Sequence, residues 1–399
     1  MLGRNAKLYV LAVAFQGLSS GIWGVIFNIY LVRVGFLDNF IGNVFTASAI
    51  ATGAIALPAG LFCERIGPRR AMLIGLTAYF VNLVLATFLD PSILLIASFA
   101  SGMIGTVSSV AGAPFIMENS GKTERTYLFS VSWALMIIMQ VVGGFAGGLM
   151  PDFFNALLHL PTGTEAGSFV GFRITLIISV ILALSTSLPI FLIREKKAER
   201  QKVTTLFHLQ NIKSPRTIIK FMIPTAMVGF GAGFIVPLFN IFFYDKLFAT
   251  SEQIGVIYAW GNITIGIGAL IAPVLSNRFG KARSVAFCEW LSLPFIMLIT
   301  VSPNISVAAS AYIFRGGFMN MASPISTNLQ MELVSDTERA TTSGLMTMSD
   351  NIPRAVTASI SGQMMTRKDF FTPFLVTTIT YVAASSIYFI FFRNSEKTK

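Results

Sequence analysis

Long apolar stretches recur along the whole chain and limit what it can fold into more than any other feature. A helix of about 20 apolar residues is long enough to cross a hydrocarbon core of about 30 Å. Hydrophobic residues make up 54% of the chain and charged residues only 12%, about half the usual share for a soluble domain. We therefore predict an all-α membrane protein with twelve transmembrane helices, at residues 8–31, 40–62, 70–89, 92–118, 127–149, 171–193, 219–243, 253–276, 283–301, 305–331, 341–366 and 370–392.

The basic residues predict which side of the membrane each loop occupies, because loops rich in Lys and Arg stay in the cytoplasm. Most of the 29 Lys and Arg residues fall in segments on one side. The opposite loops hold only Arg33, Arg173, Lys246, Arg367 and Lys368. We expect both termini in the cytoplasm and a location in the cell (inner or plasma) membrane. The net charge of +11 then suits anionic lipid headgroups and does not indicate nucleic-acid binding.

Several short sequences appear twice at nearly the same spacing. Met117–Arg125 (MENSGKTER) and Met331–Arg339 (MELVSDTER) share their first two and last three letters at an offset of 214 residues. Further pairs at offsets of 212 to 213 are Phe27-Asn28 with Phe239-Asn240, Gly42 with Gly255, and Glu64–Arg70 with Asn277–Arg283. We predict two parallel six-helix halves, residues 1–193 and 221–399, joined by a basic cytoplasmic linker at 194–220. A pseudo-two-fold axis along the membrane normal would relate them.

The loop between the second and third predicted helices carries a family signature. Gly60–Arg70 reads GLFCERIGPRR, which matches G-x-L-x-D-R-x-G-x-R-R at every specified position except that Phe62 replaces Leu and Glu64 replaces Asp. The second half keeps a reduced version of this pattern, with Arg278, Gly280 and Arg283. With this loop, the helix count and the repeat, the chain resembles the major facilitator superfamily. The resemblance implies a secondary transporter that works by alternating access.

The resemblance also assigns a role to this loop, as a lock that holds the cytoplasmic side shut while the binding site faces outward. The residues concerned are Gly60, Glu64, Arg65, Gly67, Arg69 and Arg70, with Arg278, Gly280 and Arg283 in the second half. Gly67 permits a tight turn, and Gly60 lets a neighbouring helix come close. A solvated basic loop would explain the arginines but not Glu64 and the glycines. Glu118 and Glu332, at matching helix ends, are either gate residues that change partners or simple helix caps.

The fifth predicted helix holds a trace of the drug-exporter branch of the family. Members of that branch carry a motif ending in G-P-x-x-G-G, and residues 143–148 read GGFAGG, with Gly144 in place of the proline. The resemblance to this branch implies export. Small residues at Gly143, Gly144, Gly147 and Gly148 would equally serve close helix packing, so both interpretations stay open.

Four ionisable residues fall inside predicted helices of the second half: Glu289, Arg315, Asp350 and Arg354. Such residues are costly in a membrane and usually face a cavity or a partner. The corresponding first-half positions are uncharged: Leu76, Ser101, Met136 and Gln140. The repeated fold therefore does not account for the charges. We predict that Arg315 lines a central cavity, whereas Glu289 either lines the pathway or reaches the cytoplasmic interface.

Two of these charges belong to a polar stripe on one face of the eleventh predicted helix. Its members are spaced by four, three, four, three and four residues: Ser343, Thr347, Asp350, Arg354, Thr357 and Ser361. Asp350 and Arg354 form either an ion pair that serves packing alone or one that opens for a proton or an anion. The matching stripe of the fifth helix is aromatic and apolar: Phe129, Trp133, Met136, Gln140, Gly143 and Gly147. Facing walls of these two kinds suit an amphipathic substrate.

The function predicted from these features is proton-coupled export of an amphipathic small molecule. The pathway for substrate and protons would contain Asp350, Arg354, Arg315, Glu289, Gln140, Trp133 and Thr347. We expect a monomer surrounded by membrane lipids, without enzyme activity, cofactor, metal site or nucleic-acid partner. The alternatives are an organic-anion importer or exchanger, a lipid flippase, and a non-transporting receptor with the same fold.

Overall fold

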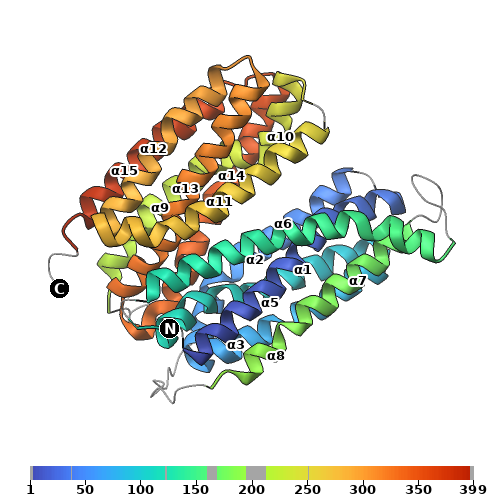
Figure 1. Cartoon of the computed structure of the whole chain (residues 1–399), viewed down its shortest axis with the longest axis horizontal. Helices are drawn as coiled ribbons and strands as arrows, with labels where there is room; N and C mark the ends of the chain where they lie inside the picture. Colours follow the sequence, from blue (N-terminus) through green and yellow to red (C-terminus); the bar gives the residue numbers. More distant parts are fainter. Residues whose placement is uncertain are drawn as a thin grey trace. The chain divides into compact units, whose positions relative to one another are not determined.

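The computed structural model describes residues 3–36, 38–121, 124–159, 169–194, 213–249 and 251–395. Within these ranges the chain forms helices joined by short turns, without a strand (Figure 1). The greater part of the predicted linker, residues 195–212, lies outside the described residues. The first helices are α1 (Arg4–Val34), α2 (Asp38–Ile66), α3 (Pro68–Gly75), α4 (Ala78–Thr87), α5 (Pro91–Asn119), α6 (Arg125–Leu157), α7 (Phe169–Ser185) and α8 (Ser187–Leu192). They are followed by α9 (Pro215–Ile235), α10 (Phe239–Ile241), α11 (Ser251–Phe279), α12 (Lys281–Val301), α13 (Ile305–Leu333), α14 (Arg339–Thr366) and α15 (Thr372–Phe392).

The chain divides into two compact units. The first consists of Met1–Ser120 and Leu135–Leu206, and the second of Gly121–Ala134 and Phe207–Lys399. The helix α6 is shared, because its residues up to Ala134 belong to the second unit and its remaining residues to the first.

In the first unit, α5 packs against α2, α3 and α4, while α1 packs against α7 and α8. Small residues let the backbones meet. A Cβ on Gly102 of α5 would lie 2.4 Å from the carbonyl oxygen of Ser48 in α2, and one on Gly75 of α3 would lie 2.3 Å from the Cβ of Ser108 in α5. Lipid tails are as apolar as the helix surfaces, so membrane helices associate through such close van der Waals contact rather than through the hydrophobic effect.

One apolar segment of the first unit is interrupted in its middle. The helix α3 ends at Gly75 and α4 begins at Ala78, with a turn at residues 76–77 between them. The hydroxyl of Thr77 donates to the carbonyl oxygen of Ile74 at 2.6 Å. This bond satisfies an acceptor near the break, which an apolar surrounding requires.

In the second unit, α9 packs against both α14 and α15, and α13 packs against α11 and α12. The core is aromatic. Its fully or nearly fully buried rings are Phe239, Phe242, Phe243, Phe374 and Tyr381. The rings of Phe242 and Phe374 meet with their centres 4.7 Å apart, within the range in which aromatic pairs attract beyond simple contact.

The chain beyond α9 is irregular. A 3-10 turn at Val236–Leu238 is followed by the short α10 and then by a π-helical stretch at Phe242–Lys246. Lys246 closes this stretch: its Nζ donates to the carbonyl oxygen of Thr300 at 2.5 Å and lies 5.1 Å from the centre of the Phe242 ring. Partial burial lowers the pKa of Lys246. A π-helical turn is rare and is often found at functional sites.

Ten helical segments of the described residues are long and apolar enough to cross a membrane. The predicted helices at 305–331 and 341–366 correspond to α13 and α14, which have 29 and 28 residues. Both exceed the length needed for a crossing, but they carry more polar side chains than the other ten. These two helices hold three of the four charges predicted from the sequence. The protein is an all-helical, multi-pass membrane protein.

Candidate functional site

Arg315, in the middle of α13, is the most deeply buried of the four predicted charges and is only 5% exposed. Its Nη2 donates to the hydroxyl of Tyr381 in α15 at 3.3 Å. The guanidinium carbon lies 5.6 Å from the centre of the Phe239 ring and 5.9 Å from that of Tyr381. Two aromatic rings thus hold the cation, each contact contributing about 1 kcal/mol.

These contacts leave the charge of Arg315 without a counterion. Among the described residues its Nε has no hydrogen-bond partner, and no carboxylate forms an ion pair with it. Desolvation of a cation costs several kcal/mol, whereas the two ring contacts and the one long hydrogen bond return about 1 kcal/mol each. The position therefore suits an anionic group that arrives from elsewhere.

Asp350 and Arg354 of α14 form an ion pair one helical turn apart. Nη2 of Arg354 lies 2.8 Å from both carboxylate oxygens, and Nε lies 3.2 Å from Oδ2. The side chain of Arg354 is 31% exposed and that of Asp350 is 29% exposed. The pair neutralises both charges and can still be reached from outside the helix packing.

Two glycines of α9 bring α14 close. A Cβ on Gly229 would lie 2.3 Å from the carbonyl oxygen of Asp350, and one on Gly233 would lie 2.3 Å from the carbonyl oxygen of Arg354. The backbone of the ion pair therefore touches the backbone of α9. No other residue type fits at these two positions without moving a helix.

Tyr381 lies at the junction of these groups and was not predicted from the sequence. It bonds Arg315 directly and is within electrostatic reach of all four predicted charges. Gly231, which lies between Gly229 and Gly233 in α9, makes room for Tyr381, because a Cβ on Gly231 would lie 2.8 Å from Cε1 of Tyr381. A tyrosine in an apolar helix gives no sequence signal of such a role.

Glu289 lies on α12 and is partly buried. It faces the hydroxyl of Ser385 in α15. Within the described residues it forms no ion pair. The structure thus brings Glu289 to α15, the helix that also carries Tyr381, and not to a basic loop.

The polar stripe of α14 separates into two parts. The hydroxyls of Thr357 and Ser361 are buried and donate to carbonyl oxygens of α9, at 2.8 Å and 2.5 Å. They join the two helices and face no cavity. Thr347 donates to the carbonyl oxygen of Ser343 one turn earlier, at 2.9 Å, and is partly buried like the ion pair. The stripe residues from Ser343 to Arg354 are thus partly exposed, whereas Thr357 and Ser361 are sealed by packing.

The predicted aromatic stripe lies on α6. Trp133 is partly buried, and its Nε1 has no hydrogen-bond partner among the described residues. Gln140 is also partly buried, and its backbone carbonyl oxygen would lie 2.1 Å from a Cβ on Gly21 of α1. The Gln140 position is thus set by helix packing.

The glycines of α6 lie along the same contact. A Cβ on Gly143 would lie 2.1 Å from a carbonyl oxygen of α1, and one on Gly147 would lie 3.1 Å from a Cα of α1. A Cβ on Gly144 would meet a side-chain atom at 3.2 Å, whereas one on Gly148 would meet no atom within 4 Å. Gly143 and Gly147 face α1, and Gly148 faces away.

The signature loop makes the same turn in both halves. Gly67 precedes α3 with φ 86° and ψ 155°, and Gly280 precedes α12 with φ 84° and ψ 157°. This combination is essentially restricted to glycine. It explains why both glycines are kept while most of the surrounding signature differs between the halves.

The other signature residues have varied surroundings. Arg69 donates to the carbonyl oxygens of Ile190 and Phe191 at the end of α8, at 3.2 Å and 2.8 Å. Arginine at a helix C-terminus satisfies exposed acceptors and suits the helix dipole. Of the remaining residues, Gly60 is buried, Glu64 and Arg65 are partly buried, and Arg70, Arg278 and Arg283 are exposed.

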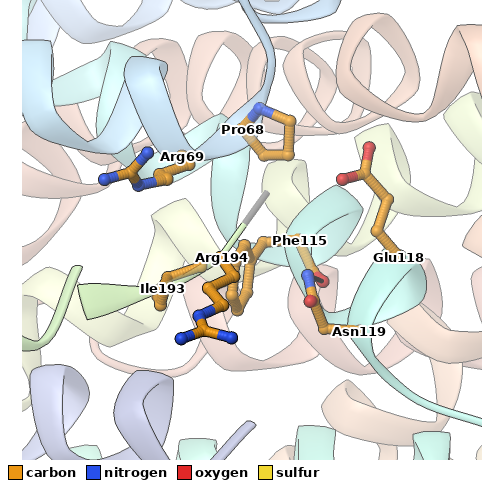
Figure 2. Close-up of a pocket in the computed structure, with 7 residues that line it drawn as sticks. All are labelled: Pro68, Arg69, Phe115, Glu118, Asn119, Ile193 and Arg194. Carbon is orange, nitrogen blue, oxygen red and sulfur yellow. Dashed lines mark hydrogen bonds between the residues drawn. The ribbon is translucent and has the colours of Figure 1, made fainter. Parts of the chain in front are cut away.

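Glu118 and Arg69 line one small pocket at an end of the first unit (Figure 2). Figure 2 shows them on opposite sides of Pro68. Next to the pocket, the amide nitrogen of Asn5 donates to Asn119 Oδ1 at 2.7 Å and to the carbonyl oxygen of Arg194 at 2.8 Å. These bonds tie the start of α1 to the ends of α5 and α8.

Glu332 occupies the matching position of the second unit in a different way. Its carboxylate lies 2.6 Å from Nζ of Lys281, and both side chains are less than one fifth exposed. By the repeat, Lys281 stands where the first unit has Pro68. The equivalent helix ends thus meet in both units, and in the second unit the ion pair of Lys281 and Glu332 joins them.

A family model described as Major Facilitator Superfamily matches residues 9–247 and, again, residues 221–399. The chain belongs to the Major Facilitator Superfamily. This confirms the resemblance inferred from Gly60–Arg70 and the repeat. As a member of the Major Facilitator Superfamily, the protein is a transporter of small molecules and not an enzyme.

Solved structures of Major Facilitator Superfamily transporters share the fold at low sequence identity. The human organic anion transporter MFSD10 is 11% identical, with a TM-score of 0.78 over 96% of this chain and 99% of that one. A bacterial homologue of the iron transporter ferroportin in the outward-facing state is 14% identical, with a TM-score of 0.75 over 97% and 98%. The transporter FucP in the outward conformation is 14% identical, with a TM-score of 0.80 over 97% of each chain. These likenesses establish the fold and leave the substrate open. No curated protein sequence matches the chain.

Proposed function

We propose that the protein is a secondary active transporter that exports an amphipathic small molecule in exchange for protons by alternating access. The observation that supports this most directly is the Asp350–Arg354 ion pair. It stays partly exposed on a long helix of the same unit that buries Arg315, for which the described residues supply no counterion. A purely structural ion pair would be expected to be sealed by packing, as Thr357 and Ser361 are.

The proposed arrangement in the membrane is twelve crossings. α13 and α14 would cross together with the ten apolar segments, their polar side chains facing a cavity. The halves at 1–193 and 221–399 would be related by a pseudo-two-fold axis along the membrane normal, with the linker at 194–220 and both termini in the cytoplasm. We expect a monomer in the cell (inner or plasma) membrane, since each half brings its own closed core.

Proton coupling would use the ion pair as a switch. When Arg354 is drawn toward an anionic group of the substrate, the carboxylate of Asp350 loses its counterion and a proton takes its place. Substrate and proton then compete for the same site. The coupling is reciprocal, because a proton that weakens substrate binding is weakened by the substrate to the same degree.

The proposed substrate is amphipathic because polar and apolar groups are segregated. The charged residues lie on helices of the second unit, with Glu289 as a second acid. Trp133 and Gln140 lie on α6, on a stripe that is otherwise aromatic and apolar. A molecule with an apolar body and a polar head fits both kinds of surface. Thr347 would add a hydroxyl near the ion pair.

The proposed gate consists of the signature loops. The glycine turns at Gly67 and Gly280 fix the course of the chain at equivalent helix ends. Glu64 and Arg65, with Glu118 and Glu332 at the neighbouring helix ends, would exchange ion-pair partners as the cytoplasmic side opens and closes. The repeated helix-end contacts of the two units support this assignment.

A second candidate function is import or exchange of an organic anion. The buried Arg315 without a counterion favours it, since an anionic substrate would supply the missing charge. A similar fold in a human organic anion transporter is compatible with this candidate. A lipid flippase and a non-transporting receptor are the further alternatives, and the transport assay below tests the receptor.

The decisive experiment uses Asp350→Asn, which imitates the protonated carboxylate permanently. Proteoliposomes with the purified protein are given a pH gradient, and movement of carboxyfluorescein or ethidium is followed as an anionic or cationic amphipathic probe. We expect the variant to lose transport driven by the pH gradient, by at least tenfold, and to retain exchange between two sides at equal pH.

The control is Asp152→Asn, an exposed acid on α6, which should transport as the wild type does. Full gradient-driven transport by Asp350→Asn would remove Asp350 as the proton carrier and make Glu289 the next candidate. Loss of both modes together with a lower Tm would mean that the ion pair is structural. Transport of neither probe by the wild type, in either direction, would favour the receptor.

A further inference from the structure

The first unit contains a cavity of about 150 Å³ between α1, α4 and α7. Its lining contains no Asp, Glu, Lys or Arg. The lining residues are Ser19, Ser20, Trp23, Gly24, Tyr79, Asn82, Ser179 and Val180. A water molecule takes about 30 Å³ in the liquid, so the cavity has room for one small organic molecule. The charged cluster, which consists of Glu289, Arg315, Asp350 and Arg354, belongs to the second unit. The cavity is therefore distinct from this cluster.

The cavity is at the middle of membrane-spanning helices and not at their ends. Ser20 lies 16 residues inside α1, which runs over Arg4–Val34, and Ser179 lies in the middle of α7. The break between α3 and α4 at residues 76–77 comes immediately before this lining. Polar groups and irregular backbone at such depth are tolerated where they line a cavity or are covered by protein.

The hydrogen-bonding groups of the lining are partly used and partly free. Oδ1 of Asn82 accepts from the hydroxyl of Ser101 at 2.6 Å, which orients the amide. Among the described residues, the amide nitrogen of Asn82 and the hydroxyl of Ser20 have no hydrogen-bond partner. By contrast, the hydroxyl of Ser19 donates to the carbonyl oxygen of Ser179 at 2.8 Å and closes one wall. The free amide donor and the hydroxyl are available to a ligand.

An aromatic ring completes the lining. Trp23 is held in place by stacking on Phe27, with ring centres 4.7 Å apart and planes at 23°. Its neighbour Gly24 leaves open space, since a Cβ there would meet no atom within 4 Å. Amide, hydroxyl and indole groups without any charge match a neutral molecule with several hydroxyls and an apolar ring face. A charged ligand would lose its hydration without gaining a counterion.

We propose that this cavity is a binding site for a neutral polyhydroxylated molecule of the size of one sugar or cyclitol ring. The site is separate from the ion pair of α14. Its occupant hydrogen-bonds to Asn82 and Ser20 and packs against Trp23.

The test is a titration of the full-length protein in detergent with myo-inositol and with D-glucose. Binding is followed by tryptophan fluorescence, for which the chain has four tryptophans, and by the shift of Tm. Binding stabilises the folded state in proportion to the logarithm of ligand saturation. We expect saturable binding of at least one of the two probes, no binding of fully O-methylated inositol, and no fluorescence response in Trp23→Phe.

Gly24→Leu adds side-chain volume to the lining at a position where a Cβ meets no atom within 4 Å, and it should weaken binding by at least tenfold. Its matched control is Gly148→Leu, a helical glycine of the same unit at which a Cβ likewise meets no atom within 4 Å. Ser20→Ala, compared with Ser185→Ala on the same scale of partial burial but outside the lining, gives a second test that does not depend on the folding of the leucine variant. We expect Ser20→Ala to weaken binding several-fold and Ser185→Ala to leave it unchanged.

Three results would overturn the proposal. One is the lack of saturable binding of both probes, and another is equal binding by wild type, Gly24→Leu and Ser20→Ala. The third is loss of polyol binding in Asp350→Asn, which would assign the signal to the charged cluster. If Asp350→Asn loses proton-coupled transport but binds the polyol, both proposals stand. If it transports normally while Gly24→Leu loses binding, only the transport mechanism fails.

Discussion

Arg315 combines deep burial with an unneutralised charge, a state that few residues can hold. Two rings and one hydroxyl surround its guanidinium, and its Nε has no hydrogen-bond partner within the described part of the chain. In a site that binds nothing, such an arginine would only destabilise the protein. Stability and ligand affinity should therefore change in opposite directions when it is removed.

Arg315→Met keeps most of the side-chain volume and removes the charge. Replacement of buried charges by apolar groups is often neutral or stabilising, by about 1–4 kcal/mol, so we expect an equal or higher Tm. Binding of the anionic probe carboxyfluorescein should fall by at least tenfold. A conservative control is Tyr381→Phe, which removes the hydrogen bond alone and should have a smaller effect on both. A lower Tm in Arg315→Met with unchanged probe binding would contradict a role in substrate recognition.

The sequence could predict the Asp350–Arg354 contact, because helical periodicity alone places side chains four residues apart on one face. It could not predict which of the neighbouring hydroxyls would line a cavity. That Thr357 and Ser361 bond to α9, and Tyr381 to Arg315, depends on which helices pack together. The periodicity of one helix carries no information about its neighbours.

At the scale of helices, α9 is the element on which the site depends. Its glycines alternate between two partners, with Gly229 and Gly233 against α14 and Gly231 against α15. The ion pair and Tyr381 are therefore held at fixed places around one helix. The polar residues of the sequence indicate a functional role for α14, whereas the glycines of α9 determine where α14 packs.

Gly229→Ala should test this packing. Its Cβ would meet the backbone oxygen of Asp350 at 2.3 Å, which a side-chain rotation cannot relieve. Overpacking of this kind costs about 1–3 kcal/mol, so we expect a lower Tm and weaker probe binding. In Gly362→Ala of α14 the Cβ meets no atom within 4 Å, and the better helix former should raise Tm slightly. Equal Tm values for both variants would contradict the contact.

The turn before α15 makes a further prediction about pH. Backbone N–H groups of Thr372 and Phe371 donate to Oδ1 of Asp369 at 3.0 Å and 3.2 Å. The bond from Thr372 is the main cause that lowers the pKa of Asp369. A lowered pKa stabilises the folded state above the ordinary pKa of about 4, and this gain is lost as the pH falls through the lowered value.

Asp369→Asn should accordingly have a lower Tm than the wild type at pH 7. The difference should narrow as the pH falls below about 4. It should be small, since the carboxylate is near the surface and screened by solvent. Melting curves between pH 7 and pH 3 measure it, and a difference that is constant or grows toward acid would contradict the assignment.

At the scale of the whole chain, the repeat preserves structure and not chemistry. Both units contain the glycine turn at Gly67 or Gly280, and in both a glutamate at a helix end lies next to the first residue of another helix. Within the described residues, the buried charged side chains all lie in the second unit. The fold and the family could be predicted from the sequence, because apolar length and the signature loop report them directly. The polar cavity of the first unit could not, since its lining comes from three separate helices without a shared motif.

The gate is best tested with substitutions that keep the fold. Glu64→Gln and Arg65→Ala should each reduce transport of the probe by at least tenfold if these residues hold the cytoplasmic side shut. Expression and Tm should stay close to those of the wild type, because both side chains are only partly buried. Arg283→Ala, an exposed arginine of the reduced signature, should have a weaker effect. Normal transport by both Glu64→Gln and Arg65→Ala would contradict the proposed gate.

The π-helical stretch at Phe242–Lys246 determines which way the side chains at the end of this helix point. A π-helical turn contains one residue more than an α-helical turn. If these five residues wound as an α-helix, everything beyond them would rotate by about 100° and shift by about 1.5 Å along the axis. Lys246 would then no longer reach the carbonyl oxygen of Thr300, and its contact with the ring of Phe242 would be lost. The π-helical winding therefore sets the register in which Lys246 reaches both the carbonyl oxygen of Thr300 and the ring of Phe242.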